Sequence, residues 1–337
     1  MNLDKQSVYL RFGAGLVARK PFNVLIQVTN RCNLKCSFCD FWPNGAHPRE
    51  ELTIEDYRKL ASDLARLGTF LISIEGGEPF IRPDLIEIVR VFGEQHLPVL
   101  YTNGWYVTPE NARKLFDAGL HQVGVSIDYP DAARHDAKRG AKGTYERAWA
   151  AIEAFKGAAP GGGKQVHVMT VLMKDNQADF ERLLEMSGEH GVGHNITLIS
   201  RKGFRRGKES VDQFPTAPLS VDLERLWRKH AHFRIFRDYL RRFDSFVTGG
   251  DLPQCRAGQQ SFNIDHLGYV STCIEKIDHP VGNVRDEAIY EIHKRLERVE
   301  EVKTCQDCWT LCRGFGQILG NGASLNAFRD LMGRMGP

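Results

Sequence analysis

Three cysteines lie close together near the start of the chain, in the stretch RCNLKCSFCDFWP. Cys32, Cys36 and Cys39 have the spacing C-x3-C-x2-C, and thiolates this close together are typical ligands of metal ions and iron–sulfur clusters. A structural zinc site needs four ligands, so three cysteines would form only part of such a site. In a cubane [4Fe–4S] cluster each iron has its own external ligand, so three thiolates leave one iron open. We therefore expect the missing fourth cysteine to mark a place where a small molecule binds.

The other five of the eight cysteines form a second group near the end of the chain: Cys255, Cys273, Cys305, Cys308 and Cys312. Residues 40–254 contain no cysteine. Cysteines that only fill a hydrophobic core would be scattered along the chain, so this separation predicts a second thiolate site. A structural zinc site on four of these thiolates remains an alternative to an iron–sulfur cluster.

The composition is that of a soluble globular protein, with 42% hydrophobic and 26% charged residues in a chain of 337. This length allows one large domain, or one large and one small domain. A net charge of +3 is no argument for nucleic acid binding. There is no run of about 18 apolar residues, and residues 1–20 lack the apolar core of a signal peptide. We expect a cytoplasmic protein without a transmembrane segment. In the reducing cytoplasm, clustered cysteines are more often metal ligands than disulfide partners.

Six short apolar runs alternate with longer amphipathic stretches, which predicts six strands alternating with helices. The predicted strands are residues 22–29, 70–75, 98–102, 122–127, 165–172 and 195–200. One predicted helix runs from Thr53 as N-cap to Gly68. A second has Thr108 as N-cap and Pro109 at its first position, and further helices are predicted over 144–156 and 177–190.

The positions of the polar motifs favour a barrel over a doubly wound open sheet. The cysteine loop follows the first strand, EGGEP the second, TNG the third and SID the fourth. Barrel active sites are built from loops at the C-terminal ends of several strands, whereas open sheets bind ligands mainly at one switch point. We therefore predict an α/β fold with a partial (β/α)6 TIM barrel, open on one side, followed by a small cysteine-rich domain.

The N-terminal part of the chain resembles the radical SAM superfamily over roughly residues 20–200. The family pattern C-x3-C-x-aromatic-C matches Cys32, Cys36, Phe38 and Cys39, and the family motif GGEP matches residues 76–79. The resemblance implies a [4Fe–4S] cluster whose open iron binds S-adenosylmethionine (SAM). It also implies that one electron cleaves SAM to a 5′-deoxyadenosyl radical, which abstracts a hydrogen atom from a substrate.

The same resemblance implies contacts between this chain and SAM. Glycines let the backbone approach a ligand closely, and a carboxylate accepts hydrogen bonds from an ammonium group. The implied SAM-binding residues are Phe38, Gly76, Gly77, Glu78, Thr102, Asn103, Ser126 and Arg139. Arg139 matches the family arginine that pairs with the SAM carboxylate. Because Glu78 follows a strand in a loop, we expect its substitution to weaken SAM binding at little cost to folding.

The second cysteine group resembles the SPASM/twitch extension of radical SAM enzymes. Cys255 and Cys273 fit C-x12-G-x4-C, and CQDCWTLC adds C-x2-C-x3-C. A full SPASM extension has seven cysteines, whereas this chain has five, which implies one auxiliary [4Fe–4S] cluster. Twitch spacing favours Cys255, Cys273, Cys305 and Cys308 as its ligands, whereas the full SPASM pattern would use Cys312. A spare Cys312 could instead donate a hydrogen atom to a substrate radical.

The sequence predicts five segments: an N-terminal extension (1–21), the radical SAM barrel (22–205), a basic helical bridge (206–250), the auxiliary cluster domain (251–316) and a C-terminal tail (317–337). Within the bridge, residues 222–243 are predicted to form one basic helix. Leu223, Leu226, Trp227 and Tyr239 would pack it, and its basic face would be solvated or would contact an anionic substrate or surface.

The predicted function is hydrogen abstraction from an unactivated C–H position of a small molecule, which would lead to oxidation, epimerisation or bond formation. The basic bridge favours an anionic substrate. An alternative is a peptide-modifying maturase, although residues 1–21 are too few for a leader-binding domain. A non-catalytic iron–sulfur sensor or scaffold is a third possibility. The enzyme would need a one-electron donor such as flavodoxin or ferredoxin, and no nucleic acid partner is expected.

Overall fold

The fold is built on one sheet of nine strands in the order β6-β5-β4-β3-β2-β1-β7-β8-β9. The computed structural model describes residues 3–205, 213–320 and 325–330. The strands are β1 (Asn23–Thr29), β2 (Leu71–Gly76), β3 (Leu97–Thr102), β4 (Gln122–Ser126), β5 (Val166–Leu172), β6 (Gly193–Leu198), β7 (Ser261–Ile264), β8 (Tyr269–Ser271) and β9 (Gly282–Asn283). Among the strands from β1 to β7, every neighbouring pair is parallel. The pair of β7 with β8 and the pair of β8 with β9 are antiparallel.

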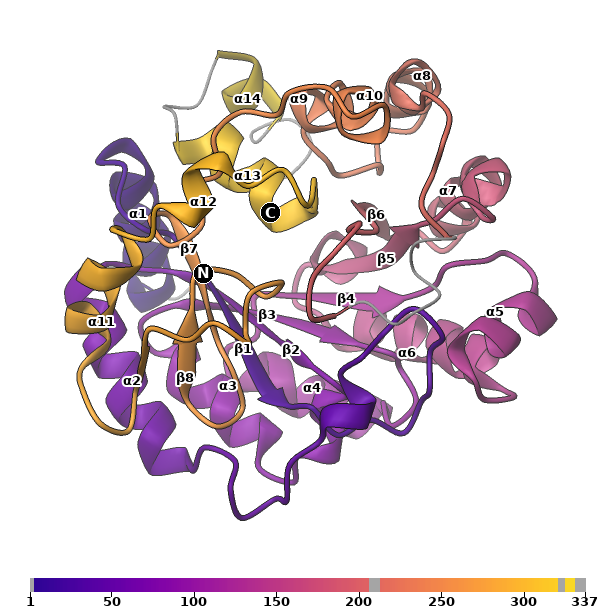
Figure 1. Cartoon of the computed structure of the whole chain (residues 1–337). Coiled ribbons are helices and arrows are strands. Elements are labelled where there is room, and N and C mark those ends of the chain that lie inside the picture. Colours follow the sequence, from indigo (N-terminus) through magenta and orange to yellow (C-terminus); the bar gives the residue numbers. More distant parts are fainter. Residues whose placement is uncertain (1–2, 206–212, 321–324, 331–337) are drawn as a thin grey trace.

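Helices lie on both sides of this sheet (Figure 1). The α-helices are α1 (Leu3–Val17), α2 (Ile54–Leu67), α3 (Leu85–Gly93), α4 (Pro109–Asp117), α5 (Ala132–Arg139), α6 (Thr144–Ala158), α7 (Phe180–Glu189), α8 (Ser220–Lys229), α9 (Arg237–Leu240), α10 (Phe243–Val247), α11 (Ile289–Leu296), α12 (Glu301–Thr304), α13 (Leu311–Gly320) and α14 (Leu325–Asp330). Short 3-10 helices cover Trp42–Asn44, Pro79–Ile81, Gly162–Gln165 and Gln177–Asp179. In Figure 1, α2, α3, α4 and α6 lie along one face of the strands, and α9, α10 and α13 lie across the other side. Among the described residues, no helix is long and apolar enough to span a membrane.

The helix starts predicted from sequence are confirmed by their caps. The Thr53 hydroxyl accepts a hydrogen bond from the Asp56 amide at 3.3 Å, and the Thr53 amide donates to the Asp56 carboxylate at 2.8 Å. Thr108 and Asn111 make the same reciprocal pair at the start of α4, with Pro109 at its first position. These caps satisfy backbone donors that have no partner inside the helix, so they fix where each helix begins.

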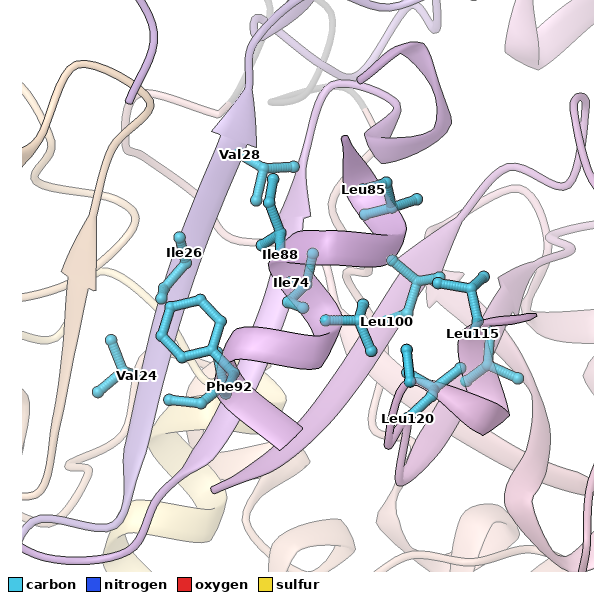
Figure 2. Close-up of a cluster of buried hydrophobic side chains, with 14 of the residues drawn as sticks. Val24, Ile26, Val28, Ile74, Leu85, Ile88, Phe92, Leu100, Leu115 and Leu120 are labelled. Atoms are coloured by element: carbon cyan, nitrogen blue, oxygen red, sulfur yellow. The ribbon is translucent and has the colours of Figure 1, made fainter. Parts of the chain in front are cut away.

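The core lies between the strands and the α2–α3–α4–α6 layer (Figure 2). Successive side chains of a strand point to opposite faces of the sheet, so alternate residues such as Ile72 and Ile74 face the helices. Figure 2 shows Ile88 and Phe92 of α3 beside Ile26 of β1 and Ile74 of β2, in the same core. The remaining strand residues face the inside of the curve, where the functional site lies.

All six predicted strands are confirmed, and the sheet does not close into a barrel. The sequence analysis did not predict that a strand after residue 251 would join the same sheet. Strand β7 pairs in parallel with β1, with Val24 opposite Phe262 and Ile26 opposite Ile264. The fully buried Phe262 ring packs edge-on against Phe70, with ring centroids 6.1 Å apart. The C-terminal cysteines are therefore attached to the sheet that carries the N-terminal ones.

The prediction of one helix over residues 222–243 is wrong. Helix α8 ends at Lys229, and the chain then runs beside β6 before α9 begins. The His194 amide donates to the His232 carbonyl, and the Arg234 amide donates to the His194 carbonyl, both at 2.9 Å. Residues 230–236 thus pair backbone groups at the edge of β6, and this tertiary pairing overrides the helical pattern.

The predicted packing of the bridge is largely confirmed, because Leu223, Leu226 and Tyr239 are buried. Its basic side chains are engaged by acids of the same surface. Arg225 and Lys229 form ion pairs with Glu181, and Arg228, Arg237 and Arg241 form ion pairs with Glu224. These pairs do not support an anion-binding role for the bridge. Residues 206–212 of the bridge, and residues 321–324 and 331–337 of the tail, lie outside the described residues.

Candidate functional site

One cavity at the C-terminal ends of the strands brings together most of the predicted site residues. Its volume is about 300 Å³. The predicted residues that line it are Cys32, Cys36, Phe38, Cys39, Gly76, Gly77, Thr102, Asn103, Ser126, Arg139 and Cys312. Apart from Cys312, which lies on α13, these residues lie at or after the C-terminal ends of the four consecutive strands β1 to β4, as expected for a barrel-type site. Glu78 is the one predicted SAM-binding residue that does not line the cavity.

The cysteine loop is folded against the end of α5. The Lys35 amide donates to the Arg139 carbonyl at 3.3 Å, and the Cys36 thiol lies 3.8 Å from the same oxygen. Burial, with a smaller contribution from negative charge on Cys39, raises the pKa of the Cys32 thiol to about 11 and that of the Cys36 thiol to about 12. Clustered thiols of this kind ionise when a metal replaces their protons, so the donor set fits an iron–sulfur cluster.

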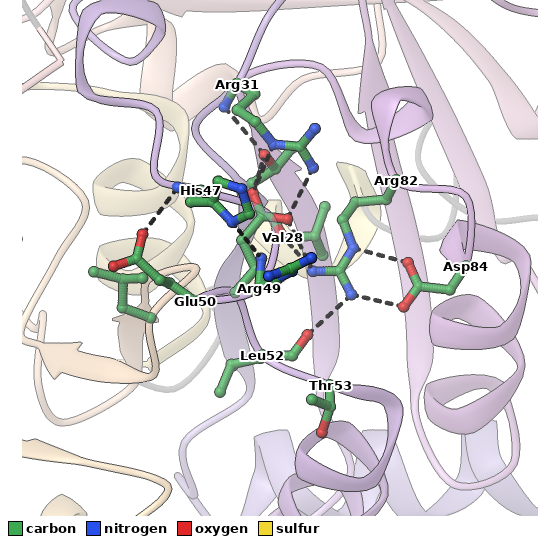
Figure 3. A network of polar contacts seen from close by, with 12 residues as sticks. Val28, Arg31, His47, Arg49, Glu50, Leu52, Thr53, Arg82 and Asp84 are labelled. Atoms are coloured by element: carbon green, nitrogen blue, oxygen red, sulfur yellow. Dashed lines mark hydrogen bonds and ion pairs between the residues drawn. The ribbon is translucent and has the colours of Figure 1, made fainter.

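A buried ionic network holds the base of the cysteine loop (Figure 3). The Glu51 carboxylate accepts from Arg31 at 2.9 and 3.1 Å, from Arg82 at 3.3 Å and from the Thr29 hydroxyl at 2.5 Å. Arg82 also donates to both carboxylate oxygens of Asp84. This network ties the end of β1 to the segments before α2 and α3, and it fixes the residue that precedes Cys32. The sequence analysis did not predict it.

The two glycines of the GGEP motif are required by close packing of backbones. Gly76 has a φ of 126°, and a Cβ atom at this position would clash with the Thr29 carbonyl. A Cβ atom at Gly77 would clash with the Arg31 carbonyl. The Gly77 amide donates to the Thr29 carbonyl at 2.7 Å, and the Glu78 amide donates to the Arg31 carbonyl at 3.0 Å. The motif therefore packs directly under the cysteine loop and lines the cavity with backbone.

The expectation that Glu78 is a replaceable loop carboxylate is wrong. Its side chain is fully buried and accepts from the Thr102 hydroxyl at 2.7 Å, the Asn103 amide at 2.8 Å and the Phe80 amide at 3.1 Å. Burial raises the pKa of Glu78 to about 7, although these three hydrogen bonds favour its charged form. Glu78 therefore joins the end of β3 to the GGEP loop.

Asn103 is fixed by this arrangement and points toward the cysteine loop. Its side-chain oxygen accepts from the Trp105 amide at 2.9 Å, and this unambiguous donor sets the orientation of the Asn103 amide group. The Asn103 Nδ2 atom consequently faces the Cys32 sulfur at 3.9 Å and the Asn33 side-chain oxygen at 2.9 Å. Asn103 thus contacts a cysteine of the loop as well as the cavity.

Arg139 is held at the cavity by Asp128, a residue that the sequence analysis did not single out. The guanidinium donates to Asp128 Oδ2 at 2.6 and 3.0 Å, and it lies 5.7 Å from the centroid of the Phe38 ring. The other Asp128 oxygen accepts from the Val171 amide at 2.9 Å. The SID motif, in which Asp128 follows Ser126, was the available sequence signal for this pair.

The C-terminal cysteines line a second, smaller cavity of about 150 Å³. All five of them contribute to its wall: Cys255, Cys273, Cys305, Cys308 and Cys312. Cys312 and Thr310 line both cavities, and the Thr310 hydroxyl lies 3.2 Å from the Cys312 sulfur. Among the described residues, no three His, Cys, Asp or Glu side chains converge on a single metal ion.

Comparisons with known proteins agree with both halves of the chain. The model of the radical SAM superfamily matches residues 26–187, and that of the SPASM iron-sulfur cluster-binding domain matches residues 255–309. The AdoMet-dependent heme synthase of Methanosarcina barkeri is 33% identical over 318 residues, covering 87% of each chain. The mycofactocin maturase MftC of Mycobacterium tuberculosis is 28% identical over 325 residues, covering 90% of this chain and 80% of its own.

Among solved structures, SuiB of Streptococcus suis bound to S-adenosylmethionine has a TM-score of 0.63 to this structure. The alignment covers 85% of this chain and 68% of SuiB, at 15% sequence identity. At this identity the likeness shows a common fold.

Proposed function

This chain belongs to the radical SAM superfamily, and on that premise we propose that its larger cavity holds SAM beside Cys32, Cys36 and Cys39 and a substrate between the two cysteine groups. The chain is an enzyme whose cofactors are SAM and [4Fe–4S] clusters. When bound and reduced, the [4Fe–4S] cluster would supply the one electron that cleaves SAM to methionine and a 5′-deoxyadenosyl radical, which would abstract a hydrogen atom from the substrate. The observation that carries the proposal is that the three cysteines and every predicted SAM-binding residue except Glu78 line one cavity.

The chain's own residues bind and orient SAM. We assign Arg139 to the SAM carboxylate, because Asp128 holds its guanidinium at the cavity wall. The backbone of Gly76 and Gly77 would receive the amino group, and Ser126 and Phe38 would contact the remainder of the molecule. Glu78 would act indirectly, by fixing Thr102 and Asn103.

We propose a small molecule as the substrate. A cavity of about 300 Å³ that also accommodates SAM has the size of a small-ligand site. The heme synthase relative is named for a small-molecule product, whereas the maturase relative supports the alternative of a peptide. We further propose a cytoplasmic location, a flavodoxin or ferredoxin as electron donor, and a division into a SAM-binding unit (22–205) and an auxiliary cluster unit (251–316). Residues 1–21, 206–250 and 317–337 would extend and connect these units.

The proposal is tested by reconstituting the protein anaerobically, reducing it with dithionite and adding SAM. We expect about eight irons per chain, since each cubane holds four, and slow release of 5′-deoxyadenosine. Changing Cys32, Cys36 and Cys39 together to Ala should remove about half of the iron and abolish SAM cleavage. A triple variant that still cleaves SAM would show that the radical cluster lies elsewhere.

A further inference from the structure

We propose that Glu75 is the residue that recognises the substrate, and that the group it binds is a positively charged N–H donor, such as a substrate ammonium. This inference rests on the proposed function and names the chemical class of substrate for the same cavity. Its basis is the position of Glu75, the absence of a hydrogen-bond donor to it among the described residues, and the charges around it.

Glu75 faces the cavity because of its register on β2. Leu71, Ser73 and Glu75 line the cavity, whereas Ile72 and Ile74 between them are fully buried in the core beneath the helices. Among the described residues that line this cavity, Glu75 is the one acid. It immediately precedes the GGEP motif, so a group bound to it would lie beside the SAM site.

Glu75 has no hydrogen-bond donor among the described residues, in contrast to the other buried acids of the site. Glu51, Glu78 and Asp128 each accept two or more hydrogen bonds from the protein. Glu75 is half-buried, and a carboxylate that is partly removed from water is destabilised unless it is paired. Burial accordingly raises the pKa of Glu75 to about 7. A donor supplied by the substrate would provide the missing partner.

The neighbouring arginine does not fill this role, because another acid already holds it. Arg205 lines the cavity, and its Nε and Nη2 atoms both donate to Glu275 Oε1, at 2.9 and 2.5 Å. The Ser200 hydroxyl donates to the same oxygen at 2.8 Å. Arg205 and Glu275 therefore balance each other, and Glu75 adds a negative charge to this wall when it is ionised. An anionic substrate group would be repelled here, contrary to the expectation from the basic bridge.

Tyr101 completes the wall next to Glu75. Its ring lies against Gly124 of β4, where a Cβ atom would come within 2.8 Å of a ring carbon. Tyr101 lines the cavity, and the negative charge of Glu75 raises the pKa of its phenol, although burial is the larger cause. An aromatic face beside a carboxylate favours a cation over an anion.

Two probes of equal length and opposite charge test this inference: n-butylammonium and n-butyrate. Binding to the oxidised holoenzyme, saturated with SAM, is measured by saturation-transfer difference NMR. We expect n-butylammonium to bind about tenfold more tightly than n-butyrate, the difference that one charged hydrogen bond supplies. The Glu75→Gln variant should lose this preference, and Glu146→Gln on the exposed face of α6 should keep it. Equal binding of both probes to the unmodified enzyme, or a preference that survives in Glu75→Gln, overturns the inference.

A separate measurement distinguishes the substrate site from the SAM site. Isothermal titration calorimetry of SAM should give the same affinity for Glu75→Gln and the unmodified enzyme. A weakened affinity would make Glu75 a SAM ligand and overturn the inference. Failure of the proposed function would show itself differently, because the unmodified holoenzyme would then release no 5′-deoxyadenosine.

Discussion

At the scale of single residues, Glu75 and Glu78 show that two glutamates within a stretch of four residues can have different roles. Glu75 lines the cavity and has no hydrogen-bond donor in the part of the chain that the structure describes, whereas Glu78 is fully buried and accepts three hydrogen bonds. The chain turns at Gly76 and Gly77, so the Glu75 carboxylate faces the cavity and the Glu78 carboxylate faces the protein interior. Their effects on stability should therefore differ.

Glu78→Ala should destabilise the fold. The change leaves three buried donors without an acceptor, and each such loss costs about 1–3 kcal/mol. We expect a clear drop in the midpoint of thermal unfolding, measured by circular dichroism. Glu94→Ala, at an exposed position after α3, is the matched control and should melt like the unmodified protein. If both variants melt alike, the Glu78 hydrogen bonds do not contribute to stability.

Asn103→Ala should lower the reduction potential of the N-terminal cluster. The Asn103 amide group faces the Cys32 sulfur at 3.9 Å, and a donor near a ligating thiolate stabilises the more negative, reduced cluster. A redox titration followed by electron paramagnetic resonance measures the shift. Asn33→Ala is the control, since it removes the other acceptor of Asn103 and leaves the contact with sulfur. An unchanged potential in Asn103→Ala would exclude this role.

The Cys312→Ala variant tests whether Cys312 is a ligand of the auxiliary cluster or a spare thiol. If Cys255, Cys273, Cys305 and Cys308 ligate the auxiliary cluster, the variant should retain about eight irons and still cleave SAM. Loss of about four irons would make Cys312 a ligand. Its place on the wall shared by both cavities is compatible with ligation and with hydrogen donation to a substrate radical.

The cysteines of the site could be predicted from sequence because their chemistry is carried by local spacing. The partners that hold them in place could not, because the fold decides these pairings. Glu51 meets Arg82 across 31 positions, and Asp128 meets Arg139 across 11. The two members of each pair do not share a helix or strand, so no periodic pattern in the sequence marks these pairs.

At the scale of elements, the pairing of β7 with β1 joins the two cysteine groups into one folding unit. Phe262→Ala should destabilise this unit by about 3–5 kcal/mol, because it removes a buried aromatic ring and leaves a cavity. Thermal unfolding should remain a single transition when it is followed at both clusters. Tyr269→Ala on the exposed side of β8 is the control, and it should have a small effect. Two separate transitions would mean that the halves fold independently.

The elements that the sequence predicted best are those with strong local signals. Helices α2 and α4 begin at the predicted caps, and the six parallel strands are apolar runs of five to eight residues. Strand β7 has only four residues, SFNI, and residues 230–236 depart from a helical pattern only because β6 offers them backbone partners. Both features depend on tertiary pairing, which local propensity does not encode.

At the scale of the whole molecule, four buried histidines make stability depend on pH. Burial lowers the pKa of His96 and His135 to about 4, and that of His167 and His194 to about 3. An unfolded histidine has a pKa near 6.5, so the unfolded state binds more protons between these values. The stability is therefore fully present above about pH 6.5 and is lost progressively as the pH falls toward 4.

Thermal unfolding of the cluster-free protein at pH 8, 6 and 4.5 checks this dependence. The midpoint should fall with decreasing pH, and His167→Leu should flatten the fall. Neither ring nitrogen of His167 has a hydrogen-bond partner among the described residues. His279→Leu, at an exposed position, should keep the full dependence. A midpoint that stays constant from pH 8 to pH 4.5 would contradict the assignment of neutral buried histidines.

The order of strands in the sheet also has a consequence for synthesis of the chain on the ribosome. The open sheet has its outer strands at β6 and β9, and residues 230–236 cover β6 while β9 is only two residues long. A bare strand edge readily pairs with a strand of another molecule. When residues 1–200 have emerged, β1 and β6 are both bare edges, and their covering segments at 230–236 and 261–264 are still to be made. The growing chain is therefore most prone to aggregation in this interval, which is when a chaperone that shields strand edges would act.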